Sequence, residues 1–372
     1  MDTELKKLRN GIDDIDDKII ELFKQRMNFA KNVGVYKREH NMAILDSVRE
    51  QGVVERASSL VPAELKGEVT LLMRSLMAFA REYQRSLQFQ NDEPLLPPPA
   101  SPKSGAVDCV YQGVPGAWSE QATRKLFPDA RLSAAAFFED VFEAVKRKTA
   151  DYGVVPIENS RSGAIGETYD LLRKYGCYVV GRTWIDIKHC LIAKPGASLT
   201  DIREVYSHPE GFRQCHRFLM NKAWDLTACS NTAVAAQKVK DAADSKVAAI
   251  GSRLAAELNG LDVIAPDIMD AANNRTSFVV IAREPEYTEK SDLISITFSL
   301  AHRSGSLCEA LLPFTASEIN LTRIESRPSA SENYRFFAEL NGNIMDPLVV
   351  DTLRHAAGVT EYLEVLGCYH TI

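Results

Sequence analysis

The N-terminal 88 residues carry an apolar repeat that constrains the fold more than any other feature of the sequence. Apolar residues recur at alternating intervals of three and four, at Leu5, Leu8, Ile12, Ile15, Ile19 and Leu22 and again at Phe29, Val33 and Tyr36. No proline interrupts residues 1–61. This spacing predicts one long helix over about 4–39 and two shorter helices over about 47–60 and 63–88.

The length of the first predicted helix implies a second subunit. A helix over 4–39 would be roughly 54 Å long at about 1.5 Å per residue, and the two helices that follow are too short to bury both of its ends. An apolar seam that stays uncovered within one chain needs a partner chain. Residues 1–88 are therefore predicted to form an all-α domain and an obligate, intertwined homodimer or a higher homo-oligomer.

The rest of the chain divides into a linker and two further domains. Residues 89–105 hold five prolines in a short polar stretch, which predicts an extended linker. Over 106–285, β-rich runs alternate with helical patterns, which predicts an α/β domain with largely parallel sheets. Over 292–372 the predicted order is strand, helix, two strands, helix and strand, the order of an α+β ferredoxin-like domain.

Composition excludes several classes of function. The formal net charge of −6 gives no basis for binding nucleic acid or an anionic membrane. No apolar stretch reaches the length of a membrane span, and the N-terminus lacks the apolar core of a signal peptide, so a cytoplasmic location is expected. The seven cysteines are scattered without a CxxC pair, which favours free thiols over disulfides or a metal site.

Charged residues occupy the N-terminal seam where another apolar residue is expected. The seam position after Leu22 is Arg26, and Lys37 lies eleven residues later, within about 20° of Arg26 around the helix. Arg9 lies about 100° from Arg26, so the two cannot converge from one straight helix, but a dimer partner could supply Arg9. A guanidinium in this position needs a compensating group. Taken alone, Arg26 could instead be a polar residue that sets helix register.

Further polar residues stand at the ends of the two shorter helices. Asp46, Arg49 and Glu50 begin the second helix, and Gln84 ends the third. Each also has a purely structural interpretation, because Ser47 to Glu50 matches a helix capping box and Asp46 suits a turn. As a set, the three cations and the neutral amide predict a site for a small dianion that contains an ether oxygen.

This pattern resembles the all-helical chorismate mutases. The matching residues are Leu8-Arg9 with Ile12-Asp13, Arg26 before Ala30, Val33-Gly34 and Lys37, Asp46 with Arg49-Glu50, and Gln84. The resemblance implies that Arg26, Arg49 and the partner's Arg9 bind the carboxylates of chorismate. It also implies that Lys37 and Gln84 contact the ether oxygen, and that Asp46 and Glu50 bind the hydroxyl side. Such a rearrangement needs charge stabilisation and a held conformer rather than a nucleophile or cofactor.

One residue of this pattern departs from the family. Ala80 stands four residues before Gln84, where the family usually has serine, so one hydroxyl contact is missing. A helical segment that has lost its activity and only dimerises therefore remains an alternative.

The central segment carries small polar motifs at the ends of its predicted strands, where open α/β sheets collect ligands. They are Tyr111-Gln112-Gly113-Val114-Pro115-Gly116-Ala117-Trp118-Ser119, Val155-Pro156-Ile157-Glu158-Asn159-Ser160, Ser207-His208-Pro209 with Gln214-Cys215, Asn231-Thr232-Ala233, and Asn274-Arg275-Thr276-Ser277-Phe278. Neither a GxxxxGK[ST] nor a GxGxxG spacing is present, so a nucleotide is not expected. Individually, His208 suits a structural role and Thr276 a turn or strand.

Together these motifs resemble prephenate dehydratase, whose two α/β lobes are arranged like those of periplasmic binding proteins around an active-site cleft. The resemblance implies that Thr276 is the catalytic hydroxyl and that the cleft is lined by Glu158, Asn159, Ser160 and Gln214. Because a threonine hydroxyl is a weak acid, Thr276 is expected to act as a donor within a network, without metal or organic cofactor. The family commonly has Thr-Arg-Phe, whereas this chain has Thr276-Ser277-Phe278, and Arg275 is a candidate to replace the missing cation.

The C-terminal segment carries two motifs that are unremarkable singly, a glycine at a strand-to-helix turn and a charged loop. In the βαββαβ context, Gly305-Ser306-Leu307 and Glu325-Ser326-Arg327-Pro328 resemble the phenylalanine-binding ACT domain. The resemblance implies that the amino acid binds there and inhibits the dehydratase.

The three segments together predict a bifunctional enzyme that converts chorismate to prephenate and prephenate to phenylpyruvate under feedback control by phenylalanine. The Tyr111 to Ala117 loop also resembles arogenate dehydratases, so an enzyme that prefers arogenate is one alternative. A non-catalytic amino-acid sensor with a two-lobed binding module is another.

Overall fold

The computed structural model of the chain describes residues 2–86, 94–103, 105–328 and 334–372. Among these residues, no helix is long and apolar enough to span a membrane. The described residues also contain no cluster of three or more His, Cys, Asp or Glu side chains that could hold a metal ion.

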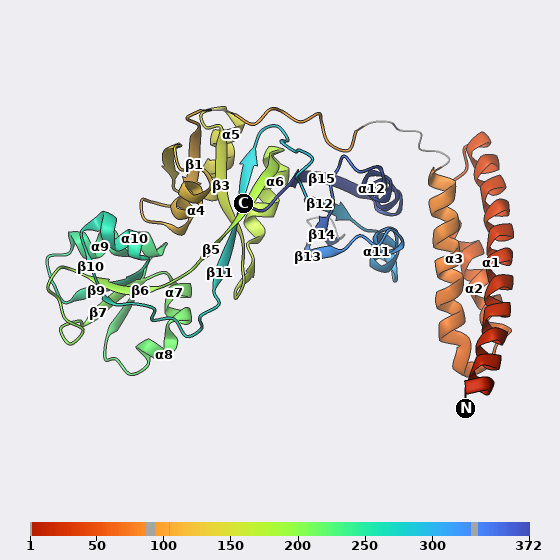
Figure 1. The fold of residues 1–372 in the computed structure, drawn as a ribbon, viewed down its shortest axis with the longest axis horizontal. Coiled ribbons are helices and arrows are strands. Elements are labelled where there is room, and N and C mark those ends of the chain that lie inside the picture. The colour runs from red at the N-terminus through yellow and green to blue at the C-terminus, as the bar shows by residue number, and fades with distance from the viewer. Residues whose placement is uncertain (1, 87–93, 104, 329–333) are drawn as a thin grey trace.

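The N-terminal domain consists of the three predicted helices. They are α1 (Asp2–Glu39), α2 (Ser47–Ser59) and α3 (Lys66–Ser86), with a 3-10 turn (Ala63–Leu65) before α3. Both α1 and α2 pack along α3 (Figure 1). The apolar seam of α1 is mostly uncovered within the chain, since Leu8 is 64% exposed and Phe29 is 72% exposed. As the sequence predicts, a further apolar surface is needed to cover the seam of α1.

The proline-rich stretch is not the unpacked linker that its composition predicts. Residues 89–93 and 104 of it lie outside the described residues. In the described part, Leu96 is only 2% exposed and belongs to the apolar core of the C-terminal domain, together with Ile294 and Leu340. Further along, the backbone N–H of Lys103 donates to the hydroxyl of Tyr152. The stretch therefore packs against the C-terminal and central domains.

The central domain has two lobes, each built on its own sheet. The first lobe comprises β1 (Asp108–Gln112), α4 (Trp118–Leu126), β2 (Arg131–Ala135), α5 (Phe138–Lys146), β3 (Tyr152–Asn159), β4 (Gly163–Ala164), α6 (Gly166–Tyr175), β5 (Tyr178–Asp186) and β11 (Arg275–Ala282). The second lobe comprises β6 (Cys190–Ala193), β7 (Glu204–Ser207), α7 (Pro209–Gln214), α8 (His216–Leu219), β8 (Asp225–Ala228), α9 (Thr232–Asp241), β9 (Val247–Gly251), α10 (Arg253–Asn259) and β10 (Asp262–Ala265). The chain leaves the first lobe after β5 and returns to it at β11 (Figure 1).

Both sheets are mixed, so the prediction of largely parallel sheets was wrong. The first has the order β2-β1-β3-β11-β5, with β4 attached to β3, and β11 runs antiparallel to both of its neighbours. The second has the order β10-β6-β9-β7-β8, in which β6 runs antiparallel to β9 and β10. The first strand after each crossing between the lobes, β6 or β11, runs antiparallel to both of its neighbours in the sheet.

The C-terminal segment has the predicted βαββαβ order. Its elements are β12 (Leu293–Ser299), α11 (Ser306–Ala316), β13 (Leu321–Pro328), β14 (Tyr334–Asn341), α12 (Pro347–Val359) and β15 (Tyr362–Tyr369). The sheet order is β13-β14-β12-β15, and every pair is antiparallel. This sheet shares a core with the first lobe, because Phe337 and Tyr369 belong to the same apolar cluster as Val279 of β11. The two units are thus packed together, not merely joined.

Two candidate active sites

The helical domain contains a cavity of about 460 Å³ between its three helices. Six of the predicted mutase residues line it, namely Arg26, Lys37, Asp46, Arg49, Glu50 and Gln84. The angular argument that placed Arg26 and Lys37 on one side of α1 is therefore confirmed. Arg9 is exposed and does not line this cavity within the chain. Ala80 lies at the cavity wall, where its methyl group offers no hydrogen bond.

The two cations of α1 that line the cavity donate to backbone carbonyls. Arg26 donates from a terminal nitrogen to the carbonyl of Leu76 at 2.7 Å, and Lys37 donates to the carbonyl of Ile44 at 2.6 Å. Burial lowers the pKa of the Arg26 guanidinium, and the charge of Glu50 opposes that shift. Neutral carbonyls leave these cations without full charge compensation, so the cavity favours an anionic ligand.

The two carboxylates at the start of α2, Asp46 and Glu50, make different contacts. Asp46 is the N-cap residue, and its side chain accepts from the backbone N–H of Arg49 at 3.0 Å. Glu50 instead forms an ion pair with Arg81 of α3, so it is not the capping-box residue that the sequence also allowed. Arg81 also lies 3.1 Å from Glu309 of the C-terminal domain. Sequence reasoning missed Arg81, because nothing in the helical pattern marks it as a partner of Glu50.

Gln84 lines the cavity, and the oxygen of its side-chain amide is a buried hydrogen-bond acceptor. Its side-chain oxygen is buried without a hydrogen-bond partner, which is costly unless a ligand supplies a donor. Gly34 of α1 makes this placement possible, because a Cβ added there would lie 2.8 Å from the Cγ of Gln84. A glycine in the long helix thus allows α3 to bring an amide to the cavity wall.

A second cavity of about 230 Å³ lies in the central domain between the two lobes. Its lining includes Asn159 of β3, Gln214 of α7 and Thr276 of β11, three of the predicted dehydratase residues. No Arg or Lys lines it among the described residues. The first residues of α4 and α9, Trp118 and Thr232, do line it, and helix N-termini present free N–H groups that bind anions.

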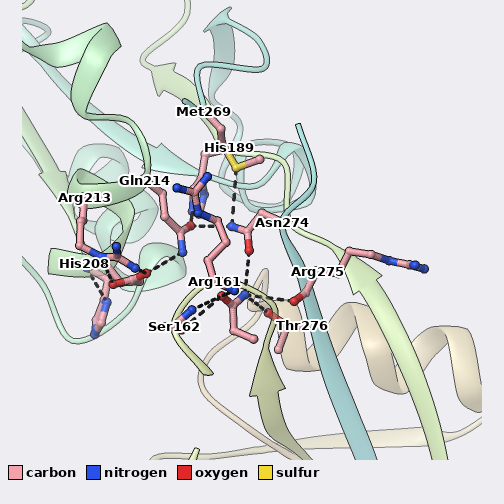
Figure 2. A network of polar contacts seen from close by, with 12 residues as sticks. Arg161, Ser162, His189, His208, Arg213, Gln214, Met269, Asn274, Arg275 and Thr276 are labelled. Carbon is pink, nitrogen blue, oxygen red and sulfur yellow. Dashed lines mark hydrogen bonds and ion pairs between the residues drawn. The ribbon is translucent and has the colours of Figure 1, made fainter. Parts of the chain in front are cut away.

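A chain of side-chain amides crosses this cleft, and its orientation is determined at both ends (Figure 2). At one end, the Asn159 oxygen accepts from the backbone N–H groups of Arg161 and Ser162. Its Nδ2 therefore donates to the Asn274 oxygen at 2.8 Å, and Asn274 donates to the Gln214 oxygen at 2.8 Å. At the other end, Gln214 donates to the carboxylate of Glu210 at 2.8 Å. Only one arrangement of the three amides satisfies all of these contacts.

This arrangement leaves the Thr276 hydroxyl as a donor. Asn159 Nδ2 donates to the Thr276 oxygen at 2.9 Å, so the Thr276 proton is available for a group in the cavity. The two residues are paired directly across β3 and β11, which explains the short contact. Thr276 thus lies within a hydrogen-bond network, in which Asn159 donates to its hydroxyl oxygen.

His189 extends the same chain and was missed by sequence reasoning, which considered His208. Its Nε2 lies 3.0 Å from the Gln214 oxygen, so Nε2 carries the proton and Nδ1 is a bare acceptor without a partner. Burial lowers the pKa of His189 to about 4, so the ring is neutral near pH 7. The indole of Trp118, whose nitrogen is also unpartnered, packs edge to face against it. His208 is exposed, and its Nδ1 accepts from the backbone N–H of Glu210.

Two predicted cleft residues and the proposed replacement cation lie elsewhere. Glu158 is paired with Ser277, and both face away from the cleft, because successive side chains of a strand point to opposite faces. Ser160 does not line the cavity, and its hydroxyl accepts from the backbone N–H of Arg275. The Arg275 side chain points outward in Figure 2 and pairs with Asp186, so it does not replace a cation in the cleft.

The two C-terminal motifs lie at the first helix and second strand of that domain. Gly305 adopts a φ of 87° at the N-terminus of α11, a conformation that favours glycine, and Ser306 and Leu307 begin the helix. Glu325, Ser326, Arg327 and Pro328 form the end of β13. Arg327 lies against Gly166 of α6, where any larger residue would collide with its guanidinium.

A helical cavity lined by cations and a separate cleft lined by amides and a hydroxyl define an enzyme with two active sites. Residues 8–85 match the family model for chorismate mutase type II, and residues 109–286 match the one for prephenate dehydratase. The bifunctional chorismate mutase/prephenate dehydratase of Neisseria gonorrhoeae is 32% identical over 98% of this chain and 96% of its own length. The chain therefore belongs to the family of bifunctional chorismate mutase/prephenate dehydratases.

Two further relatives bear on substrate and effector. Arogenate dehydratase/prephenate dehydratase 2, chloroplastic, of Arabidopsis thaliana is 33% identical over 90% of this chain and 88% of its own length. A crystal structure of prephenate dehydratase in complex with L-Phe from Arthrobacter aurescens has a TM-score of 0.66 and 28% identity. It covers 71% of this chain and 90% of that one.

Proposed function

We propose that this member of the family carries out both reactions of its name with the residues described above. Chorismate is rearranged to prephenate in the helical cavity, and prephenate is converted to phenylpyruvate in the cleft of the central domain. The observation that carries the assignment is the presence of both sites in one chain, one lined by Arg26, Lys37 and Arg49 and the other by Asn159, Gln214 and Thr276.

In the helical cavity, Arg26 and Arg49 bind the substrate carboxylates. Lys37 and Gln84 contact the ether oxygen, whose bond to carbon breaks as a carbon–carbon bond forms. Negative charge grows on that oxygen in the transition state, and a fixed ammonium stabilises it more than it stabilises the ground state. Asp46 and Glu50 bind the hydroxyl side of the ring.

In the cleft, Thr276 donates a proton to the departing ring hydroxyl, which leaves as water, and Thr276 takes up a proton from solvent in turn. The electrons of the bond to the carboxylate move into the ring as carbon dioxide departs, and the ring becomes aromatic. Prephenate and one proton thus give phenylpyruvate, carbon dioxide and water. Asn159 holds the Thr276 oxygen so that its proton faces the substrate, and the N-termini of α4 and α9 bind the substrate anions.

The substrate of the second site is prephenate, because the first site produces it. The relative named arogenate dehydratase/prephenate dehydratase makes arogenate the specific competitor. We expect kcat/KM of the purified protein to be at least tenfold higher for prephenate. A higher value for arogenate would reverse this assignment and leave the reaction class unchanged.

The functional unit is a homodimer in which the helical domains pair. Along α1, Leu8, Ile12, Ile15 and Ile19 are each more than half exposed in the single chain. Pairing would bury this surface and would bring the partner's Arg9 to a cavity that lacks it. Mixing Arg9→Ala protein with Lys37→Met protein should restore mutase activity, because one of the two sites in a mixed dimer is then intact. Absence of any restoration would contradict a shared site.

Residues 292–372 form a ferredoxin-like ACT domain that binds phenylalanine and inhibits the dehydratase. The motifs from Gly305 to Leu307 and from Glu325 to Pro328 support this, as does the L-Phe complex of the Arthrobacter aurescens relative. The protein is expected to act in the cytoplasm, where its seven free cysteines stay reduced.

One assay tests the whole proposal. Purified protein is supplied with chorismate, and both chorismate loss and phenylpyruvate formation are followed with and without phenylalanine. We expect both conversions, with the second slowed by the amino acid. Chorismate loss without phenylpyruvate would contradict the dehydratase assignment, and an unchanged second rate would contradict the effector.

A further inference from the structure

A largely buried group of four charged residues joins the first lobe to the C-terminal domain, and Glu158 is its most exposed member, with 27% of its side chain exposed. Arg182 of β5 pairs with Glu339 of β14 at 2.5 Å and lies 3.6 Å from Glu158 of β3. Arg323 of β13 pairs with the same Glu158 at 2.5 Å. Two guanidinium groups and two carboxylates balance one another, so the group is neutral as a whole. Loss of one member would leave an unpaired charge in a buried place.

Arg182 also makes a contact that reaches the catalytic strand. Its Nε donates to the hydroxyl of Ser277 at 2.8 Å, and Ser277 is fully buried. Ser277 directly follows Thr276 in β11, and the two side chains point to opposite faces of the sheet. The strand therefore presents Thr276 to the cleft and Ser277 to the C-terminal domain.

The backbone at Arg182 is tied to the same domain. The N–H of Ile372 donates to the Arg182 carbonyl at 2.7 Å, and Thr371 bridges to Arg182 in parallel. Close approach of β15 depends on Gly367, because a Cβ added there would lie 2.1 Å from the carbonyl oxygen of Val179. Side chain and backbone together fasten this point of β5 to the C-terminal domain.

We propose that Arg182 is a positioning residue of the dehydratase, which fastens the Thr276 strand to the C-terminal domain through Ser277 and Glu339. Displacement of that domain would then disturb the position of the Thr276 strand. The guanidinium that the Thr-Arg-Phe pattern leads one to expect at position 277 is supplied from the neighbouring strand, on the face away from the cleft. This inference rests on the proposed role of Thr276.

The most direct test removes only the Ser277 hydroxyl. In the full-length protein, Ser277→Ala should lower dehydratase kcat at least fivefold, with KM within twofold and mutase activity unchanged. The matched control is Ser295→Ala, which removes another buried hydroxyl at this interface, bonded to Tyr369 at 2.6 Å and not to β11. The control should retain its dehydratase kcat. An unchanged kcat for Ser277→Ala, or an equal loss in both variants, would overturn the proposal.

A second test moves the guanidinium from one strand to the other. Arg182→Ser should lower dehydratase kcat at least tenfold, and Ser277→Arg alone should also lower it because it adds an unpaired cation. The double variant should recover to within threefold of the native kcat. A double variant no better than Arg182→Ser would refute the positioning role.

The two proposals fail in different ways. If Thr276→Val retains dehydratase activity, the proposed chemistry of the cleft is wrong. If Thr276→Val is inactive while Ser277→Ala matches the native kcat, only the positioning role of Arg182 is wrong.

Discussion

The two candidate active sites offer a small dianion different kinds of polar groups. The helical cavity is lined by Arg26, Lys37 and Arg49, whereas the cleft between the lobes has no Arg or Lys in its described lining. Helix N-termini and the oriented amides of Asn159 and Gln214 line the cleft instead.

The difference follows from the two reactions. A pericyclic rearrangement transfers no proton, so a fixed positive charge beside the ether oxygen is sufficient catalysis. Elimination of water and carbon dioxide needs a proton donor, and a site of low polarity favours loss of a carboxylate. A nearby cation would stabilise that carboxylate before it leaves. The comparison therefore predicts that charge changes affect the first site and hydroxyl or protonation changes affect the second.

Removal of the Thr276 hydroxyl should have the largest effect. Thr276→Val keeps the shape of the side chain but removes the proton donor, so dehydratase kcat should fall by about 10² to 10⁴. Phenylpyruvate formation from prephenate measures this, and mutase activity in the same sample is the control. A loss below tenfold would show that another group protonates the leaving hydroxyl.

Removal of the Lys37 charge should have the next largest effect, on the other site. Lys37→Met keeps the length of the side chain but removes the ammonium, so mutase kcat should fall by about 10² to 10³. Chorismate loss is followed spectroscopically, and dehydratase activity on added prephenate should stay at the native level. If both activities fell together, the two sites would not be independent.

The buried neutral imidazole of His189 should make the cleft sensitive to acid. Its pKa is about 4 in the folded protein, below the ordinary value of about 6.5. The unfolded chain therefore binds the extra proton first, and stability falls as pH drops from about 6.5 towards 4. Between pH 7.5 and 5 the loss should be about 2 kcal/mol.

Calorimetry of the native protein and of His189→Gln at both pH values measures this loss of stability. The variant should lose less stability than the native protein across the interval, because its amide does not titrate. Equal losses in the two proteins would show that other groups cause the acid sensitivity.

The smallest expected difference between the two sites is in how KM responds to salt. Raising ionic strength from about 0.05 M to about 0.5 M shortens the Debye length and weakens the attraction between exposed charges. The mutase KM for chorismate should rise several-fold, whereas the dehydratase KM should change less than twofold. A stronger salt effect on the dehydratase would contradict the contrast between charged and amide-lined sites.

Much of the helical site could be predicted from sequence, because a helix converts spacing into direction. Arg26 and Lys37 line one cavity, as their angular separation indicates, and all three helices lie where the periodicity places them. The short strands of the central domain offer no comparable periodic signal. Cys190–Ala193 is buried on both faces and only four residues long, so it shows no alternation that sequence could reveal.

The cleft depended on contacts between residues far apart in the chain. The sequence identified Thr276, Asn159 and Gln214, but Asn274 as the link between the two amides and His189 beyond Gln214 emerged only from the fold. No local pattern specifies which of several polar side chains a strand from the other lobe brings within hydrogen-bonding distance.

The sequence by itself determined the family of the chain, the order of its helical, α/β and βαββαβ segments, and six residues that line the helical cavity. Only the tertiary structure decided which face of a strand each residue occupies. The missing arginine at Ser277 suggested a gap in the cleft, yet Ser277 faces the C-terminal domain and receives its guanidinium from Arg182. Position along a strand is encoded locally, whereas the neighbour across the sheet is set by pairing and packing of distant segments.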